Sequence, residues 1–181
     1  MARSVIVTGG FGVLGNAVAE AFARQGDKVA RIDFAPSARS ALAGALDIGG
    51  VDLADGDSTT AAHGGLDVLV NVAGGFTWET LGDGSIDSWA RMQAMNLMTA
   101  ATITQLALPE LTKAEAVRIV NIGAGAAIKA GMGMGAYAAS KSGVHRLTEA
   151  LAEELAGTGA TGNAGLPSII DTPTNRAGMP N

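Results

Sequence analysis

The stretch SVIVTGGFGVLGNAVAEAFARQG, residues 4–26, decides the fold class. It begins with a short apolar run typical of a buried strand and continues with the apolar periodicity of a helix. Gly9, Gly12 and Gly15 lie between the two in a G-x-x-G-x-x-G spacing. Such a turn lets backbone N–H groups and a helix N-terminus approach a pyrophosphate, so it predicts an anion-binding cradle. The alternative is a tight strand–helix turn that holds no ligand.

The same alternation of strand and helix patterns continues along the chain. Further strands are expected at 28–34, 66–74 and 117–125, and further helices at 85–111 and 137–157. Strands that alternate with helices in this way form right-handed crossovers and a parallel sheet covered on both faces. The sequence therefore predicts a doubly wound α/β Rossmann fold with three αβα layers.

Two stretches fit this pattern less well. Residues 52–65 leave room for only a short helix of weak helix formers, and the glycines of 157–166 disfavour an interior strand. We therefore expect either a fold that is trimmed at its C-terminal end, or a sequence that lacks residues from these loops and the C-terminus.

The composition restricts the classes of function. The chain has 181 residues and a formal net charge of −5, with its charged residues scattered, so no nucleic-acid partner is expected. Because it has no cysteine and two histidines, no metal site is expected either. No apolar run reaches the roughly 18 residues of a membrane span. We expect one cytoplasmic domain over residues 1–181 with no membrane partner.

Asp33 predicts which dinucleotide the cradle binds. It ends the second expected strand, where a carboxylate can accept hydrogen bonds from both adenosine ribose hydroxyls and repels a 2′-phosphate. The predicted cofactor is NAD, with NADH preferred over NADPH. Arg31 lies two residues earlier on the same face of the strand, and so not beyond Asp33. Alternatively, Asp33 is a turn residue before Pro36.

Other segments are expected at the same carboxyl edge of the sheet. NVAG, residues 71–74, ends a strand with small residues that permit close approach to an adenosine. Asp52 and Leu53 are placed to flank the adenine, although an aspartate that starts a loop is commonplace. The predicted cofactor contacts from these segments and from the cradle are Gly9, Phe11, Gly12, Val13, Leu14, Asp33, Asp52, Leu53, Asn71, Ala73 and Gly74.

Tyr137 and Lys141 are the candidate acid/base pair. They are four residues apart and lie on one face of the expected helix. A nearby ammonium favours phenolate and lowers the pKa of a tyrosine, which suits proton transfer. This spacing alone arises by accident in many helices. The acid/base interpretation therefore depends on the position of the pair, which follows NVAG and the next strand. His145 lies about 12 Å from Tyr137 along the helix axis, and we expect it to pack on a surface or subunit-facing part of the helix.

The motifs TGGFGVLG, Asp33, NVAG, Asn96 in MNLMTA, and YAASK, in this order, resemble the short-chain dehydrogenase/reductase family over nearly the whole chain. The resemblance implies that Tyr137 exchanges a proton while hydride passes between nicotinamide C4 and a small-molecule substrate. It also implies that Lys141 binds the nicotinamide ribose and lowers the phenol pKa, and that Asn96 holds a water of the proton relay. The alternative for Asn96 is a polar helix residue bonded to backbone.

Two further implications follow from this resemblance. Pro167, Ile170 and Thr172 of LPSIIDTP match the segment that contacts the cofactor's carboxamide and pyrophosphate. The family also implies a homodimer or homotetramer that pairs through the helices at 85–111 and 137–157.

Ala124 is a departure from the family, because it lies where the catalytic serine is expected, thirteen residues before Tyr137. The dihydropteridine reductase branch shares this departure, and the chain resembles it in NVAGGF, in the histidine of SKSGVHRL and in LPSIIDTPTNRAGMP. Asn96 fits the wider family better than that branch. The branch implies a conjugated acceptor such as quinonoid dihydropterin. The rival interpretation is a catalytically silent NAD(H)-binding sensor or assembly subunit.

Four residues near these motifs have two interpretations. Phe76 and Trp78 are placed to stack on a flat ring, and Met132 and Met134 to line a substrate pocket, while core packing explains all four equally well. Trp89 is expected in the core.

Overall fold

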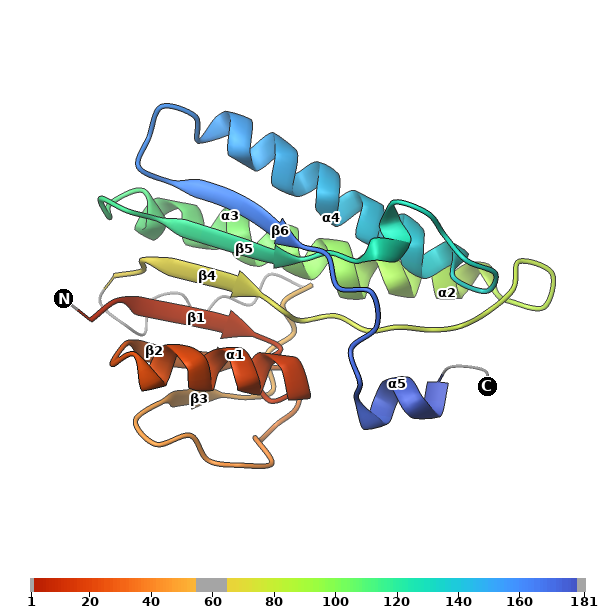
Figure 1. Ribbon diagram of the computed structural model, residues 1–181, viewed down its shortest axis with the longest axis horizontal. Coiled ribbons are helices and arrows are strands. Elements are labelled where there is room, and N and C mark those ends of the chain that lie inside the picture. Colours follow the sequence, from red (N-terminus) through yellow and green to blue (C-terminus); the bar gives the residue numbers. More distant parts are fainter. Residues whose placement is uncertain (1, 55–64, 179–181) are drawn as a thin grey trace.

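The computed structural model describes residues 2–54 and 65–178, and over these residues it contains a six-stranded parallel sheet with the order β3-β2-β1-β4-β5-β6 (Figure 1). The strands are β1 Ser4–Thr8, β2 Lys28–Ile32, β3 Leu46–Ile48, β4 Val68–Asn71, β5 Arg118–Ile122 and β6 Thr161–Gly165. The helical segments are α1 Val13–Arg24, α2 Ile86–Met92, η2 Gln93–Met98, α3 Thr99–Leu111, η3 Gly125–Ala127, α4 Gly135–Glu154 and α5 Pro173–Gly178.

The sheet has a hydrophobic core on each face. Val5 and Val7 of β1 pack with Ala19 of α1, whereas Ile6 between them packs with Ile103 of α3 and Leu151 of α4. This alternation follows from the two-residue period of a strand. Burying an aliphatic side chain of this size contributes about 1.5–3 kcal/mol, so α1 on one face and α3 with α4 on the other hold the sheet in place (Figure 1). The predicted doubly wound α/β fold is confirmed.

The structure differs from the expected elements at three places. The helix expected at 85–111 is divided, because the π-helical turn η2 separates α2 from α3. A short strand, β3, pairs with β2 at one edge of the sheet and was not expected from the sequence. The glycine-rich segment 161–165 forms β6, which lies at the other edge of the sheet. Most of the stretch 52–65, where a short helix was expected, lies outside the described residues.

Two findings concern the membrane partner and the metal site that the sequence does not predict. None of the helices in the described part of the chain is both long and apolar enough to span a membrane. Over residues 2–54 and 65–178, the structure holds no cluster of three or more histidine, aspartate or glutamate side chains that is arranged for a metal ion.

Candidate active site

The glycine turn joins β1 to α1 as predicted, and its backbone approaches two other segments closely. Gly9 has φ +64°, and a Cβ added to it would lie 2.7 Å from the backbone nitrogen of Ala73. A Cβ at Gly15 would collide with the carbonyl oxygen of Gly9. Helix α1 begins at Val13 with no side-chain cap and no acidic residue in its first turn. Its first N–H groups and the positive end of its dipole therefore suit an anion.

Asp33 lies beside this turn at the end of β2. Its Oδ2 accepts a hydrogen bond of 2.9 Å from the backbone N–H of Phe11, and its Oδ1 accepts one of 2.9 Å from that of Ala35. An ionised carboxylate has about four acceptor sites, so both oxygens retain capacity for further donors. Asp52 instead accepts from the backbone of Ala54, and the side chain of Leu53 is buried in the core.

The NVAG segment is held against the end of β1. The Oγ1 of Thr8 accepts hydrogen bonds from the backbone N–H groups of Val72 at 3.1 Å and Ala73 at 3.2 Å. Thr8 was not singled out from the sequence, although it directly precedes the glycine turn. The contact places Ala73 and Gly74 next to the cradle.

The Asn71 side chain has a structural role, and the expected cofactor contact of this residue stays a prediction. It is buried in the sheet and donates to Thr104 Oγ1 at 3.0 Å and to Asn121 Oδ1 at 2.8 Å. Asn121 in turn donates to Thr148 Oγ1 at 2.9 Å. This buried polar chain links β4 and β5 to α3 and α4. The position of Asn71 at the strand end did not reveal which way its amide points.

Gly74, Asn96 and Lys141 meet at the carboxyl edge of the sheet. A Cβ added to Gly74 would lie 2.5 Å from Asn96 Oδ1 and 3.5 Å from Lys141 Nζ. Lys141 Nζ donates a 2.7 Å hydrogen bond to the carbonyl oxygen of Ile122, at the end of β5. Three motifs that are far apart in the sequence are therefore in contact at one point.

The Asn96 side chain uses both of its N–H donors and one of its two acceptor sites within the protein. Its Oδ1 accepts from the N–H of Gly75 at 2.9 Å, and its Nδ2 donates to the Gly75 carbonyl at 3.1 Å and to Ser140 Oγ at 3.0 Å. The alternative interpretation, a polar residue bonded to backbone, therefore describes its side chain. Asn96 lies in η2, and single π-helical turns are frequent at functional sites. Ser140 also donates to the carbonyl of Tyr137, a role that the YAASK motif could have suggested.

Burial sets the pKa values of the candidate acid/base pair. It raises the pKa of the half-buried Tyr137, and it lowers the pKa of Lys141, which is 5% exposed, to about 8. Burial alone accounts for the direction of the Tyr137 shift in this structure, and the expectation that Lys141 lowers the tyrosine pKa stays a prediction. The Tyr137 ring is held by the ring of Phe76, which meets it edge to face at a centroid distance of 5.0 Å and an angle of 86°.

The lysine shift predicts a pH dependence of stability. Below pH 8 the ammonium is charged in both states, and the folded state carries the full cost of burying it. As the pH rises from 8 towards the ordinary lysine value near 10.4, the folded protein binds fewer protons, so this cost disappears. Between pH 7 and 9.5 the unaltered chain should gain about 2 kcal/mol of unfolding free energy relative to Lys141→Met. Urea unfolding of both proteins measures this, and parallel pH dependences would contradict it.

Ala124 and His145 are in contact directly after β5. Ala124 is 2% exposed, and its N–H donates to His145 Nε2 at 3.4 Å. A Cβ at Gly123 would collide with the same nitrogen, so the imidazole fits only because this residue is glycine. Burial lowers the pKa of His145 and favours its neutral form. His145 is partly exposed, and its ring contacts the turn after β5. The expectation that it packs on a surface or subunit-facing part of the helix stays a prediction.

The segment after β6 lies alongside the end of β5. The N–H of Gly125 donates to the carbonyl of Pro167 at 2.9 Å, which places Pro167 at the same edge of the sheet as Ala124. Asn175 donates to the carbonyl of Ile170 at 2.7 Å and to Thr172 Oγ1 at 3.1 Å. Thr172 therefore stabilises the start of α5.

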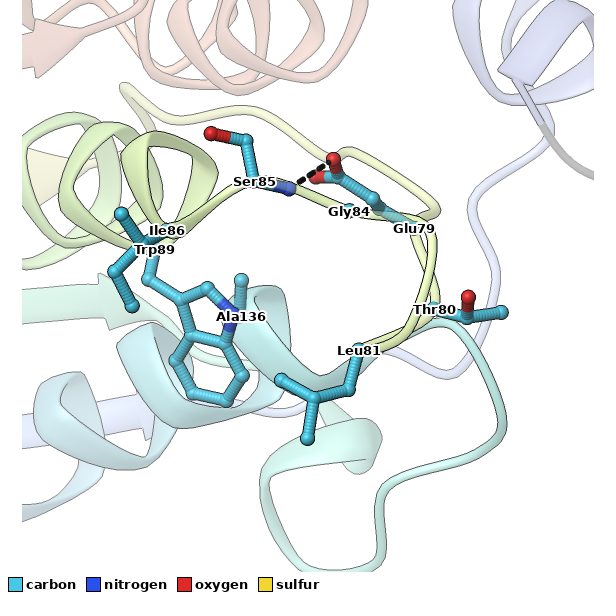
Figure 2. Close-up of a pocket in the computed structure, with 8 residues that line it drawn as sticks. All are labelled: Glu79, Thr80, Leu81, Gly84, Ser85, Ile86, Trp89 and Ala136. Atoms are coloured by element: carbon cyan, nitrogen blue, oxygen red, sulfur yellow. Dashed lines mark hydrogen bonds between the residues drawn. The ribbon is translucent and has the colours of Figure 1, made fainter.

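A cavity of about 220 Å³ lies under the loop before α2 (Figure 2). Trp89 and Leu81 face it from the apolar side, and Glu79 closes the loop by accepting a 2.7 Å hydrogen bond from the N–H of Ser85. Ala136, which directly precedes Tyr137, forms part of its wall. Trp89 thus lines a cavity, which corrects its expected place in the core. The cavity is lined by Glu79, Thr80, Leu81, Gly84, Ser85, Ile86, Trp89 and Ala136.

The other aromatic and methionine residues have different environments. Trp78 packs against Gly133, whose Cβ would collide with the indole ring. The side chain of Met132 is exposed, and Met134 is half-buried at the start of α4. Only Phe76 among these residues contacts the acid/base tyrosine through its ring in the described structure.

The profile of the short chain dehydrogenase family matches residues 3–180. The chain belongs to the short-chain dehydrogenase/reductase family. It is 33% identical to nodulation protein G of Azospirillum brasilense over 185 residues, which cover 94% of this chain and 75% of that protein. It is 31% identical to D-beta-hydroxybutyrate dehydrogenase of Cupriavidus necator, over 94% of this chain and 72% of that protein.

A solved structure of the family supports the same assignment. Ligand-free aldohexose dehydrogenase of Thermoplasma acidophilum superposes with a TM-score of 0.87 and 29% sequence identity, over 97% of this chain and 70% of that one. The resemblance recognised from the motifs is therefore confirmed at the level of the family, and the chain is a short-chain oxidoreductase. The similarity to the dihydropteridine reductase branch stays a prediction.

Proposed function

We propose that the chain is an NAD(H)-dependent oxidoreductase that couples hydride transfer at nicotinamide C4 to proton transfer by Tyr137. The observation that carries this proposal is the contact of Gly74 with both Asn96 and Lys141. It joins the ligand-binding edge of the sheet to the helix that carries Tyr137. Lys141 is the electrostatic partner of the tyrosine in this proposal, and Asn96 organises the proton relay by holding a water.

The residues at the glycine turn fit a dinucleotide. A side chain at Gly9 would collide with the backbone of Ala73, and a side chain at Gly15 would collide with the carbonyl of Gly9. Only glycines therefore allow the turn to pack this closely. The uncapped N-terminus of α1 suits a pyrophosphate, and Asp33 retains acceptor sites for ribose hydroxyls. Such a dinucleotide supplies the hydride chemistry when it is bound. Pro167, Ile170 and Thr172 are proposed to contact it from the segment after β6.

The side chains at the site suggest how the proton moves. Because burial raises the pKa of Tyr137, its phenol is protonated at neutral pH and can donate a proton in the reductive direction. Lys141, with a pKa of about 8, carries a positive charge at neutral pH and is positioned by the Ile122 carbonyl. A positive charge near the phenol stabilises the phenolate that forms as the proton leaves.

The carboxylate of Asp33 should make the chain bind NADH well ahead of NADPH. In Asp33→Ala the ribose loses its acceptor and the 2′-phosphate loses its repulsion, so the two affinities should become closer. Calorimetric titration of both proteins with both nucleotides measures the difference. Equal affinities of the unaltered chain for NADH and NADPH would contradict this role of Asp33.

Ala124 supports a conjugated ring as the acceptor. Alanine has no hydroxyl to hold a carbonyl oxygen, whereas Phe76 lies against Tyr137 and offers a ring to a planar substrate. We propose a small-molecule acceptor such as quinonoid dihydropterin. The alternative is a C–OH or C=O substrate, which the names of D-beta-hydroxybutyrate dehydrogenase and aldohexose dehydrogenase favour.

An acceptor screen tests the proposed function. The chain should bind NADH and oxidise it when a suitable acceptor is added, which is followed by the loss of NADH absorbance. Binding of NADH without turnover for any acceptor would favour the catalytically silent binding protein. Failure to bind either nucleotide would contradict the proposed function as a whole.

A homodimer or homotetramer is part of the proposal. Ile86 of α2 and Met95 and Met98 of η2 are exposed apolar side chains on the helices that the family resemblance implicates in pairing. Sedimentation of the purified chain measures the number of subunits.

A further inference from the structure

Arg31 is a fully buried cation directly beneath the glycine turn. Its side chain is 0% exposed, and a Cβ at Gly10 would lie 2.6 Å from the Arg31 Cβ. The guanidinium also lies under the Phe11 ring, 5.5 Å from its centroid. A positive charge therefore lies beside the place where the proposed nucleotide binds, although Asp33 is the group that selects NADH there.

Asp47 of the edge strand β3 holds this cation. The Arg31 Nε donates to Asp47 Oδ1 at 2.7 Å and its Nη2 donates to Asp47 Oδ2 at 2.7 Å, a bidentate pair. Strands β2 and β3 place these two residues directly opposite each other in register. Asn16 and the carbonyl of Ser40 accept two further guanidinium hydrogens, at 2.5 Å and 3.0 Å.

The position of Arg31 relative to Asp33 gives this pair its significance. The two residues leave the same face of one strand, roughly 7 Å apart, which is within the reach of an extended arginine side chain. A free guanidinium there could bind a 2′-phosphate in a bidentate manner, which is the geometry that arginine favours for phosphate. The guanidinium is instead bound to Asp47 and turned under the cradle.

We propose that Asp47 is a second determinant of the preference for NADH over NADPH, because it holds Arg31 away from the site of the 2′-phosphate. This inference rests on the proposed NAD(H)-dependent function and names a residue of β3 that no motif marks. Asp33 repels the phosphate, and Asp47 removes the cation that would otherwise bind it. Both effects must be reversed before NADPH is bound well.

A double-mutant cycle tests this inference by calorimetric titration with NADH and NADPH. In Asp33→Ala, Arg31 stays paired with Asp47, so the gain in NADPH affinity should be small. In Asp47→Ala, the freed Arg31 should pair with Asp33 and weaken NADH binding. The double variant should bind NADPH at least about tenfold more tightly than Asp33→Ala does, the value of one charge-assisted hydrogen bond.

Two controls separate this effect from a general loss of structure. Adding Arg31→Met to the double variant replaces the buried charge by an apolar side chain, a change that proteins often tolerate. This third substitution should abolish the gain in NADPH affinity. Adding Arg39→Ala instead removes an exposed cation of the loop after Asp33 and should leave the gain in place. If Asp47→Ala does not fold, Asp47→Asn keeps an acceptor oxygen, removes the charge and enters the same cycle.

The outcomes distinguish this inference from the proposed function. A gain in NADPH affinity that needs both substitutions and Arg31 supports the role of Asp47. Retained NADH binding by the unaltered chain, with additive effects of the two substitutions on NADPH, overturns it and leaves the proposed function intact. If the unaltered chain binds neither nucleotide, the proposed function fails and the inference fails with it.

Discussion

Tyr137→Phe should lower the turnover number by about 10²- to 10⁴-fold, the contribution of a positioned proton donor. The substitution removes one hydroxyl and keeps the ring, so the edge-to-face contact with Phe76 is retained. The phenolic oxygen of Tyr137 has no hydrogen bond to the described residues, whereas its backbone carbonyl accepts from Ser140 in either protein. The measurement is the steady-state rate of NADH oxidation with the best acceptor.

The control for this prediction is the affinity for NADH, which should change little because the cradle and Asp33 are untouched. Thermal unfolding of Tyr137→Phe should also match that of the unaltered chain. An unchanged turnover number would show that the proton comes from another group. A loss of NADH binding equal to the loss of turnover would mean that Tyr137 acts in binding and not in proton transfer.

The fold could be predicted because its decisive signals are local. The run before Gly9 and the periodic segment after it identify β1 and α1, and their spacing requires a parallel crossover. The short strand β3 could not be predicted in the same way. Its three residues include an aspartate and lie at the sheet edge, where pairing with β2 decides the structure. The division of the long helix by η2 likewise has no signal in the apolar periodicity.

The site could be predicted only where a motif fixes the backbone. The G-x-x-G-x-x-G turn, NVAG and the Tyr137–Lys141 helix were predicted at one edge of the sheet. In the structure Gly9 lies against Ala73, and Gly74 lies against Lys141. Side-chain direction and burial depend on packing between elements distant in sequence. For that reason the structural role of the Asn71 side chain, the contact of His145 with Ala124 and the raised pKa of Tyr137 were not foreseen.

The missing serine leads to the second large effect. An alanine at position 124 leaves the Tyr137–Lys141 pair able to deliver a proton, but no hydroxyl from this position can hold a carbonyl oxygen. A lost oxyanion donor costs about 2.7–4 kcal/mol in other enzymes, or roughly 10²- to 10³-fold in rate. Simple ketones should therefore be poor substrates, and a conjugated ring acceptor, which is held by stacking, should be turned over measurably.

Ala124→Ser should raise the rate of ketone reduction by up to roughly 10²- to 10³-fold. The rate with ring acceptors should change little. Ala124 has extended backbone angles, φ −161° and ψ 147°, which serine adopts without strain. Ala126→Ser is the matched control, because it adds the same hydroxyl to the adjacent turn and should not improve ketone reduction. Efficient ketone reduction by the unaltered chain would show that another residue already supplies the donor. An absence of turnover with every ring acceptor would instead favour the silent binding protein, because Tyr137 would then have no acceptor to protonate.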